Sequence, residues 1–284
     1  AAFDDTWHWD DMVSGQALIE LRDSPHQEAA KMLDAMVGFL GKNPMTAYLA
    51  MMAVRLVELH RVLRPTGSLY LHCDPTASHY LKILLDAVFG AKNYRNEIVW
   101  KRTFAHNDPE QYGRISDYLL FYSKSEKYTF NRQHTAYEES YLENNFRLYD
   151  KKGRYQLVTL TGPKTNPQDP EWRGYHPSSS GRSWSVPRRL VTKVGGEKAL
   201  RLSVIERLEL LEENGLIVFS KNGIPRFKHY ADDLPGTPCQ SIWNDIPPLS
   251  AHAKERLHYP TQKPVALLER ILNASSNPGD VVLD

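Results

Sequence analysis

The chain has 284 residues with 35 basic and 34 acidic side chains, so its formal net charge at pH 7 is +1. This balance argues against a protein that coats nucleic acid with a uniformly basic surface. No apolar run approaches the roughly 20 residues that span a bilayer. Cys73 and Cys239 are too few for a disulfide framework or a cysteine-based zinc site, and they favour a reduced, cytoplasmic setting. The start, residues 1–10, is acidic and unlike a signal peptide.

The charges are unevenly distributed along the chain. Residues 1–30 carry Arg22 alone against a run of carboxylates, whereas basic residues dominate 150–200. Such asymmetry favours a middle region that faces a polyanion, and a solvated loop surface explains it equally well. The basic residues of this region are Lys151, Lys152, Arg154, Lys164, Arg173, Arg182, Arg188, Arg189, Lys193 and Lys198.

Helices and strands alternate in the first half, as is typical of an α/β sheet. An apolar stripe over 44–63 predicts a helix. Asp74-Pro75 supplies an N-cap and a first-turn proline for the next helix, which Gly90 ends. The predicted strands are Ser68–Cys73, 97–101 and 117–123.

Two polar side chains stand at the end of the first predicted strand. His72 and Asp74 are suited to acid–base chemistry. A strand-end histidine followed by an N-cap aspartate is more often structural.

Regular periodicity fades from about residue 130, and turn signals become dense. Trp172, Tyr175 and Trp184 are interleaved with arginines. This mixture suits phosphate contact and stacking on nucleic acid, or else a loop-rich subdomain held by its aromatic side chains. We expect a mixed α+β subdomain inserted into the α/β core. Its predicted elements are a helix over 202–211 and strands over 216–219 and 224–228.

The last stretch has the most specific pattern. Pro264 suits the first turn of a helix, and Asn277-Pro278-Gly279 stops that helix. Residues 281–283 form a short apolar run, as expected of a parallel strand buried on both faces. Asp284 then stands at the carboxyl end of that strand, where open α/β sheets bind ligands.

These patterns predict one α/β core assembled from both ends of the chain. We expect 1–128 and 246–284 to form it, with 281–283 parallel to 69–73 in the same sheet. The Pro-Pro within 245–249 is interpreted as a rigid connector back into the core.

The segments Tyr259-Pro260-Thr261-Gln262-Lys263-Pro264 and Pro278-Gly279-Asp280-Val281-Val282-Leu283-Asp284 resemble the amino-methylating DNA methyltransferases. The similar subgroup is the one whose catalytic region precedes its cofactor-binding region. This resemblance implies a Rossmann-like core, S-adenosylmethionine as cofactor, double-stranded DNA as substrate, and adenine N6 or cytosine N4 as the methylated amine. It also implies a restriction subunit or a second copy as partner, with no metal and no membrane.

Two signature loops of that family are absent from the 284 residues: the catalytic Asp-Pro-Pro-Tyr/Phe motif and the Phe-x-Gly-x-Gly cofactor loop. The sequence therefore reads as if it were cut through its cofactor site. We expect this polypeptide to be an inactive fragment that binds the cofactor no more tightly than roughly millimolar.

The resemblance also implies residue roles. Lys263 and Thr261 have ordinary alternatives, a surface lysine and a helix cap, and Trp100 either stacks on an extruded base or fills the interior. The region 129–245 corresponds to the target-recognition region, and 246–284 begins the cofactor-binding region. The residues implied to border the cofactor are Thr261, Gln262, Lys263 and Asp284. Those on the target-base side are His72, Asp74 and Trp100, and those that contact DNA are Lys151, Lys152, Arg173, Arg182, Arg188 and Arg189.

Two other functions fit parts of the pattern. A DNA-binding module without catalysis fits the basic middle region and the missing motifs. A dehydrogenase-like nucleotide enzyme fits the sheet, but the chain contains no Gly-x-Gly-x-x-Gly.

Overall fold

A computed structural model describes residues 7–163, 169–250, 252–257 and 261–284. Lys164 and the Tyr259-Pro260 part of the terminal motif lie outside these residues, as does part of the acidic start. No helix in these ranges is long and apolar enough to cross a membrane.

The chain divides into two compact units, each with a core of its own. The first comprises 1–133 and 238–284, and the second comprises 134–237. The second unit begins later and ends earlier than the insertion expected over 129–245.

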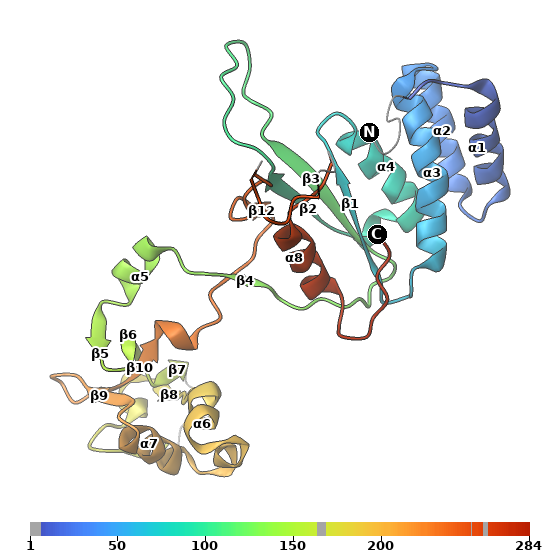
Figure 1. Ribbon diagram of the computed structural model, residues 1–284. Coiled ribbons are helices and arrows are strands. Elements are labelled where there is room, and N and C mark those ends of the chain that lie inside the picture. The colour runs from blue at the N-terminus through green and yellow to red at the C-terminus, as the bar shows by residue number, and fades with distance from the viewer. Residues whose placement is uncertain (1–6, 164–168, 251, 258–260) are drawn as a thin grey trace. The chain divides into compact units, whose positions relative to one another are not determined.

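The first unit is built on a four-stranded mixed sheet in the order β1-β3-β2-β12 (Figure 1). β1 (Ser68–Cys73) and β2 (Tyr94–Lys101) are both antiparallel to β3 (Ser116–Ser123), which lies between them. β12 (Ile242–Trp243) is parallel to β2. The predicted mixture of helices and strands is thus confirmed, and the carboxyl ends of β1 and β2 meet the beginning of β3.

Helices cover one face of this sheet. Leu81, Leu84 and Leu85 of α4 are fully buried in one cluster with Leu120 and Tyr122 of β3. Burial of each such leucine stabilises the fold by about 1.5–3 kcal/mol. The helices that build outward from this face are α1 (Asp11–Asp23), α2 (Gln27–Leu40), α3 (Pro44–Val62) and α4 (Ser78–Phe89).

Local chemistry explains where these helices begin and end. α3 starts with a reciprocal capping box: the Asn43 side chain accepts from the Thr46 amide, and the Thr46 hydroxyl accepts from the Asn43 amide. The sequence predicted that Asp74 caps α4, but the N-cap residue of α4 is Ala77. The Asp74 carboxylate accepts from the amides of Thr76 and Ala77 at 3.0 and 3.2 Å, which forms a separate turn before the helix.

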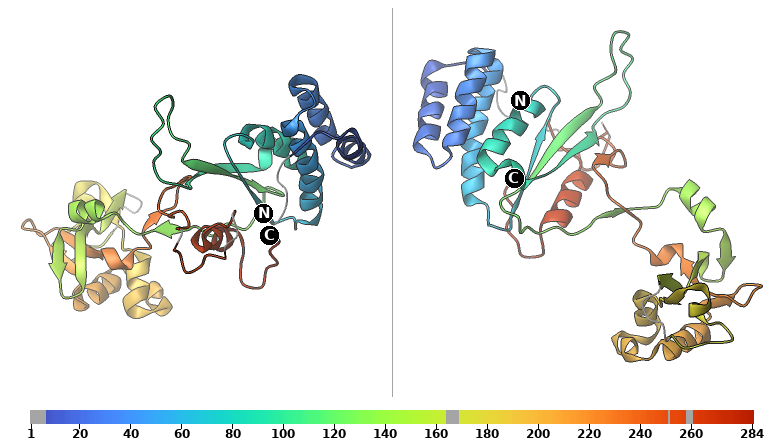
Figure 2. Two further views of the ribbon diagram at one scale, coloured as in Figure 1. Left: turned by 45° about the horizontal axis from the view of Figure 1, so that its top comes forward. Right: turned by 180° about the vertical axis from the view of Figure 1, so that it is seen from behind.

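The opposite face of the sheet is covered by α8 (Val265–Ser275), as the edge-on view in Figure 2 shows. Leu267 and Ile271 pack there with Trp100 and Phe121. Pro264 is the N-cap residue of α8, one position before the first turn in which the sequence placed it.

The predicted strand at 281–283 is not formed. This segment makes no strand pairing, and Val281, Val282 and Leu283 are 86%, 54% and 71% exposed. The expectation of a buried strand parallel to β1 is therefore wrong for this structure. An apolar run becomes a strand only where a neighbouring backbone pairs with it, and the segment lies beside β1 without doing so.

The second unit has a separate hydrophobic core. β10 (Pro225–Tyr230) is antiparallel to both β6 (Gly153–Thr159) and β9 (Ile217–Phe219), and α7 (Val204–Glu213) buries Leu208 and Leu211 in the core. The predicted helix and hairpin are confirmed as α7 and β9–β10. The remaining strands and α-helices are β4 (His134–Thr135), α5 (Glu139–Asn145), β5 (Leu148–Asp150), β7 (Thr161–Pro163), β8 (Arg182–Trp184) and α6 (Arg188–Gly195), and β11 (Thr237–Pro238) lies at the boundary with the first unit.

Candidate functional site

A charged cluster forms where the ends of β1 and β2 meet the beginning of β3. His72 Nε2 lies 2.8 Å from Asp117 Oδ2, and Arg102 Nε lies 3.0 Å from Asp117 Oδ1. Asp117 is only 6% exposed; its Oδ2 shares a hydrogen bond with His72, whereas Oδ1 has the ion pair with Arg102 but no hydrogen-bond partner among the described residues. We call His72, Arg102 and Asp117 the strand-end cluster.

Trp100 packs against the His72 ring of this cluster. Its ring meets His72 edge to face at 5.8 Å, and its indole N–H donates to the Ile246 carbonyl at 3.0 Å. Trp100 is 3% exposed, so the structure shows the interior alternative and no open ring face for a base. Its observed contact is therefore one that orients His72.

Cys73 and Asp74 lie beside the cluster without entering its hydrogen bonds. Burial, and after it the nearby carboxylates of Asp74, Asp117 and Glu97, raises the pKa of the Cys73 thiol to about 12. A thiol of this kind is protonated at neutral pH and is a poor nucleophile. The Asp74 carboxylate is occupied by its own turn.

Lys263 brings the terminal motif to the same end of the sheet. The pKa of its ammonium group is lowered, mainly by burial. The Asp117 carboxylate opposes this shift, and the Arg102 charge adds to it. Lys263 Nζ donates to the Thr261 carbonyl at 2.7 Å. One residue implied for the cofactor thus lies within electrostatic range of Asp117, the partner of His72, which was implied for the target base.

The other residues implied for the cofactor lie differently. Thr261 is exposed, and the Gln262 side chain is used within its own loop, where it accepts from the Leu257 amide and donates to the Glu255 carbonyl, both at 2.7 Å. Asp284 lies beside β1, and no hydrogen bond or ion pair joins it to Lys263 among the described residues.

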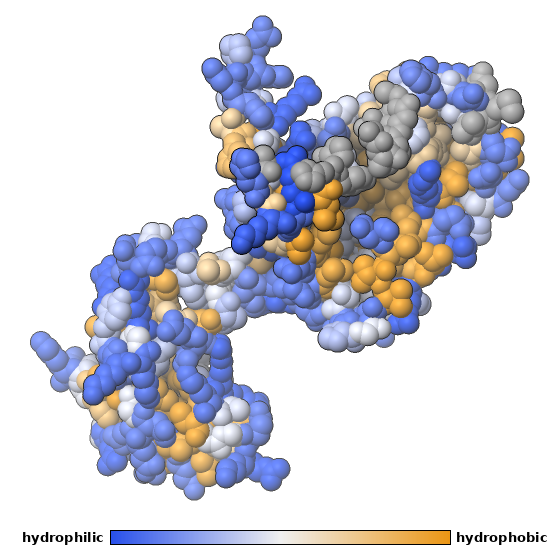
Figure 3. All heavy atoms as spheres, viewed as in Figure 1, coloured by the Kyte–Doolittle hydropathy of each residue, from blue (hydrophilic) through white to orange (hydrophobic). Residues whose placement is uncertain are grey.

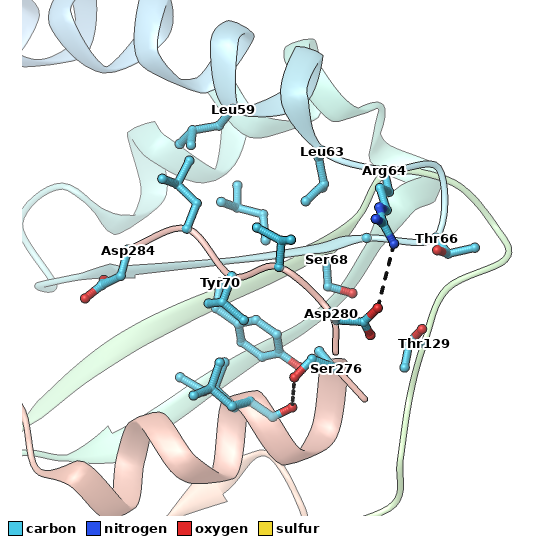
Figure 4. A pocket seen from close by; sticks show the side chains of 18 of the residues that line it. Leu59, Leu63, Arg64, Thr66, Ser68, Tyr70, Thr129, Ser276, Asp280 and Asp284 are labelled. Carbon is cyan, nitrogen blue, oxygen red and sulfur yellow. Dashed lines mark hydrogen bonds and ion pairs between the residues drawn. The ribbon is translucent and has the colours of Figure 1, made fainter. Parts of the chain in front are cut away.

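A groove runs along the free edge of β1 (Figure 4). Arg64 and Asp280 form an ion pair across one end at 3.8 Å. Tyr70 and Ser275 share a 2.7 Å hydrogen bond on its floor, and burial raises the pKa of Tyr70 to about 12. Hydrophobic residues gather around the groove in the space-filling view (Figure 3).

The six basic residues of the second unit that were implied to contact DNA separate into two groups. Arg173 pairs with Glu212 at 2.9 Å, Arg182 donates to Thr161, and Lys152 donates to the Asn214 carbonyl, so these three serve the fold. The other group is exposed and has no hydrogen-bond or ion-pair partner among the described residues. It consists of Lys151, Arg188 and Arg189.

The aromatic residues of this unit pack against one another. Trp172 is 4% exposed, and it meets Trp184 edge to face at 6.3 Å. Tyr175 meets the same Trp184 ring at 5.6 Å. These rings hold the subdomain together, which favours the packing alternative over an open stacking surface.

Asp117 is the site residue that sequence reasoning missed. It was placed only as the first residue of a predicted strand. The available signal was a carboxylate that opens an otherwise apolar and aromatic run, 117–122. No group of three or more metal-ligating side chains is found in the described part of the chain.

Fold and site together define a mixed α/β protein with a charged cluster at one sheet end and a separate unit that exposes unpaired arginines. The family model described as DNA methylase matches residues 38–284, and the chain belongs to that family.

Three relatives illustrate the match. The Type II methyltransferase M.EcaI of Enterobacter cloacae is 30% identical over 84% of this chain and 49% of its own length. The Type III restriction-modification enzyme StyLTI Mod subunit of Salmonella typhimurium is 24% identical over 86% of this chain and 37% of its own. The DNA adenine methyltransferase YhdJ of Escherichia coli is 43% identical over 25% of this chain and 22% of its own. The chain spans about half the length of M.EcaI and less of the other two.

Proposed function

We propose that the protein transfers a methyl group from S-adenosylmethionine to the exocyclic amine of adenine (N6) or cytosine (N4) in a specific DNA sequence. The observation that carries this proposal is the family match, which runs through both units of the fold. The names of the relatives, which include DNA and Type II methyltransferases, point in the same direction.

The strand-end cluster suits the target side of this reaction. An exocyclic amine is a poor nucleophile because its lone pair is delocalised into the ring, so the protein must position it closely. The base must also leave the duplex to be reached. His72 is 2.8 Å from a buried carboxylate and lies against Trp100, so its ring is held in one orientation. Such a rigid donor or acceptor is what positioning requires.

The residues near the terminal motif have the chemistry that the cofactor needs. S-adenosylmethionine carries a carboxylate, an ammonium group and ribose hydroxyls, and it supplies the methyl group when bound. Lys263 offers a partly buried ammonium group for a carboxylate, and Thr261 offers an exposed hydroxyl. Asp284 offers an exposed carboxylate that suits an ammonium group or a hydroxyl. We assign these three residues to cofactor contact.

The second unit is proposed to choose and hold the DNA. Lys151, Arg188 and Arg189 are cations without partners, and such groups are suited to phosphate contact. A restriction subunit or a second copy is proposed as partner, because one relative is named as the Mod subunit of a Type III restriction-modification enzyme.

A second candidate is a DNA-binding module without catalysis, and the exposed cations Lys151, Arg188 and Arg189, which have no partner among the described residues, favour it. This candidate keeps the role of the arginines and leaves the strand-end cluster with a purely structural one.

The test is methyl transfer from labelled S-adenosylmethionine to DNA by the complete protein. We expect label in duplex DNA, and hydrolysis followed by mass spectrometry then distinguishes N6-methyladenine from N4-methylcytosine. DNA binding is measured in parallel by fluorescence anisotropy. Binding without label in DNA of mixed sequence would favour the module, and label at a ring carbon would contradict the proposed chemistry.

A further inference from the structure

A hairpin leaves the sheet directly above the strand-end cluster. β2 ends at Lys101 and β3 begins at Ser116, and residues 102–115 between them extend beyond both strands (Figures 1 and 2). We call residues 102–115 the arm. Its connection to the cluster is direct, because Arg102 is both the first residue of the arm and a partner of Asp117.

The base of the arm is fixed to the sheet. The Arg102 amide donates to the Ile115 carbonyl at 2.9 Å, which closes the hairpin where the strands end. Arg102 Nε is held 3.0 Å from the buried Asp117 carboxylate. Further out the two sides still approach closely, because a Cβ atom at Gly113 would lie 3.4 Å from the Cβ and the carbonyl oxygen of His106.

The tip of the arm is held by a local turn. Asp108 Oδ1 accepts from the amides of Glu110 and Gln111 at 3.0 and 3.3 Å, and Oδ2 accepts from the Gln111 side chain at 3.1 Å. The bond from the Glu110 amide, followed by that from the Gln111 side chain, lowers the pKa of Asp108. The carboxylate therefore stays charged, and the turn persists, at neutral pH.

Two aromatic rings on this arm have no place in any core. Phe104 is 68% exposed and Tyr112 is 99% exposed. Neither ring contacts another ring or a cation among the described residues. Lys101, Arg102 and Arg114 add exposed positive charge near these rings.

We infer that the arm binds duplex DNA beside the target base, with Phe104 and Tyr112 stacking on bases exposed by its extrusion. This inference rests on the proposed function and extends it to a surface outside both the strand-end cluster and the second unit. An extruded base leaves its former neighbours without stacking, and an aromatic side chain restores part of that stacking whatever the sequence.

The geometry favours DNA over a protein partner. A stable protein interface buries more than about 1,000 Å² in total and centres on a packed apolar patch, which two rings on a narrow hairpin do not provide. Base stacking needs only single rings with adjacent cations. The anchored base and the turn at the tip also spare the arm part of the ordering entropy that binding would otherwise require.

The test compares the full chain with its Phe104→Ala/Tyr112→Ala variant in anisotropy titrations. The probes are two fluorescent duplexes of the same mixed sequence, one fully paired and one with a single central mismatch, which eases extrusion. We expect the variant to lose about tenfold or more in affinity for the mismatched duplex. Less loss is expected on the paired duplex. The slope of log affinity against log salt should not change, because the rings neutralise no phosphate.

The matched control is Phe39→Ala, which removes a ring that is 86% exposed on α2. It should bind both duplexes as the parent does, and all three proteins should melt at the same temperature. Parent-like affinity of the double variant for the mismatched duplex overturns the inference and leaves the proposed function standing. Loss of self-association in place of DNA affinity overturns it as well. If the parent chain binds neither duplex, both the inference about the arm and the proposal that this chain binds DNA are overturned.

Discussion

Replacement of Arg188 and Arg189 by alanine separates DNA contact from folding. Both residues stand in the first turn of α6, where the helix already carries partial positive charge, so two guanidinium groups there destabilise it. No partner neutralises them among the described residues. Burial, and after it the Arg189 charge, lowers the pKa of His229 nearby. An arrangement so unfavourable for the helix is explained if the arginines meet phosphate.

The structure gives the size and sign of both effects. Each lost phosphate contact flattens the plot of log affinity against log salt by about 0.9, so the double variant should lose about 1.8. Between about 50 and 200 mM salt, the affinity of the double variant should therefore fall about tenfold less than that of the parent. Relief of the helix dipole should raise the free energy of unfolding by about 0.3–1 kcal/mol per arginine. Weaker binding should thus accompany greater stability.

Anisotropy titrations at several salt concentrations measure the slope, and urea unfolding measures the stability. Arg55→Ala/Arg61→Ala is the matched control, because it removes two exposed charges from α3 in the first unit. That control should leave the slope unchanged. An unchanged slope for the α6 variant, or a loss of its stability, would refute the reasoning.

Two further predictions concern stability. Asp117→Asn should lower the free energy of unfolding by about 2 kcal/mol in urea titrations, because two charge-assisted contacts lose their charge; a change near zero would show that the carboxylate does not hold the cluster. Burial is the largest cause that lowers the pKa of both His26 and His60, whose rings meet at 4.8 Å. The unfolded chain therefore binds more protons, so this stability is complete above the ordinary histidine pKa of 6.5 and falls as the pH drops below it. In the His26→Gln/His60→Gln variant the melting temperature should fall less steeply as the pH drops below 6.5. If its dependence on pH matched that of the parent, these histidines would not be the cause.

The helices and strands with strong local patterns could be predicted from the sequence. β1 runs over Ser68–Cys73 as predicted, and α4 ends where Gly90 adopts a φ of 82°. The periodicity of the apolar residues and the terminating glycine act within a few positions of one another. Local energetics therefore decide such elements, and no long-range partner has to be known.

Predictions that needed a distant partner failed or were incomplete. Residues 281–283 have the composition of a buried strand, yet composition does not say which backbone pairs with them. Asp74 makes the hydrogen bonds expected of a cap, but they close a turn, because the choice between turn and helix depends on how α4 packs on β3. Side-chain chemistry was thus easier to predict than the position at which it acts.

The strand-end cluster depends on one topological fact that no local pattern contains. β3 follows β1 and β2 in sequence but lies between them in the sheet. Its register pairs Asp117 with Trp100 on one side and Leu119 with His72 on the other. Insertion of β3 at any other place would leave the Asp117 carboxylate away from His72 or from Arg102. The same insertion closes residues 102–115 into a hairpin above the cluster, so the arm and the candidate site have a single structural cause.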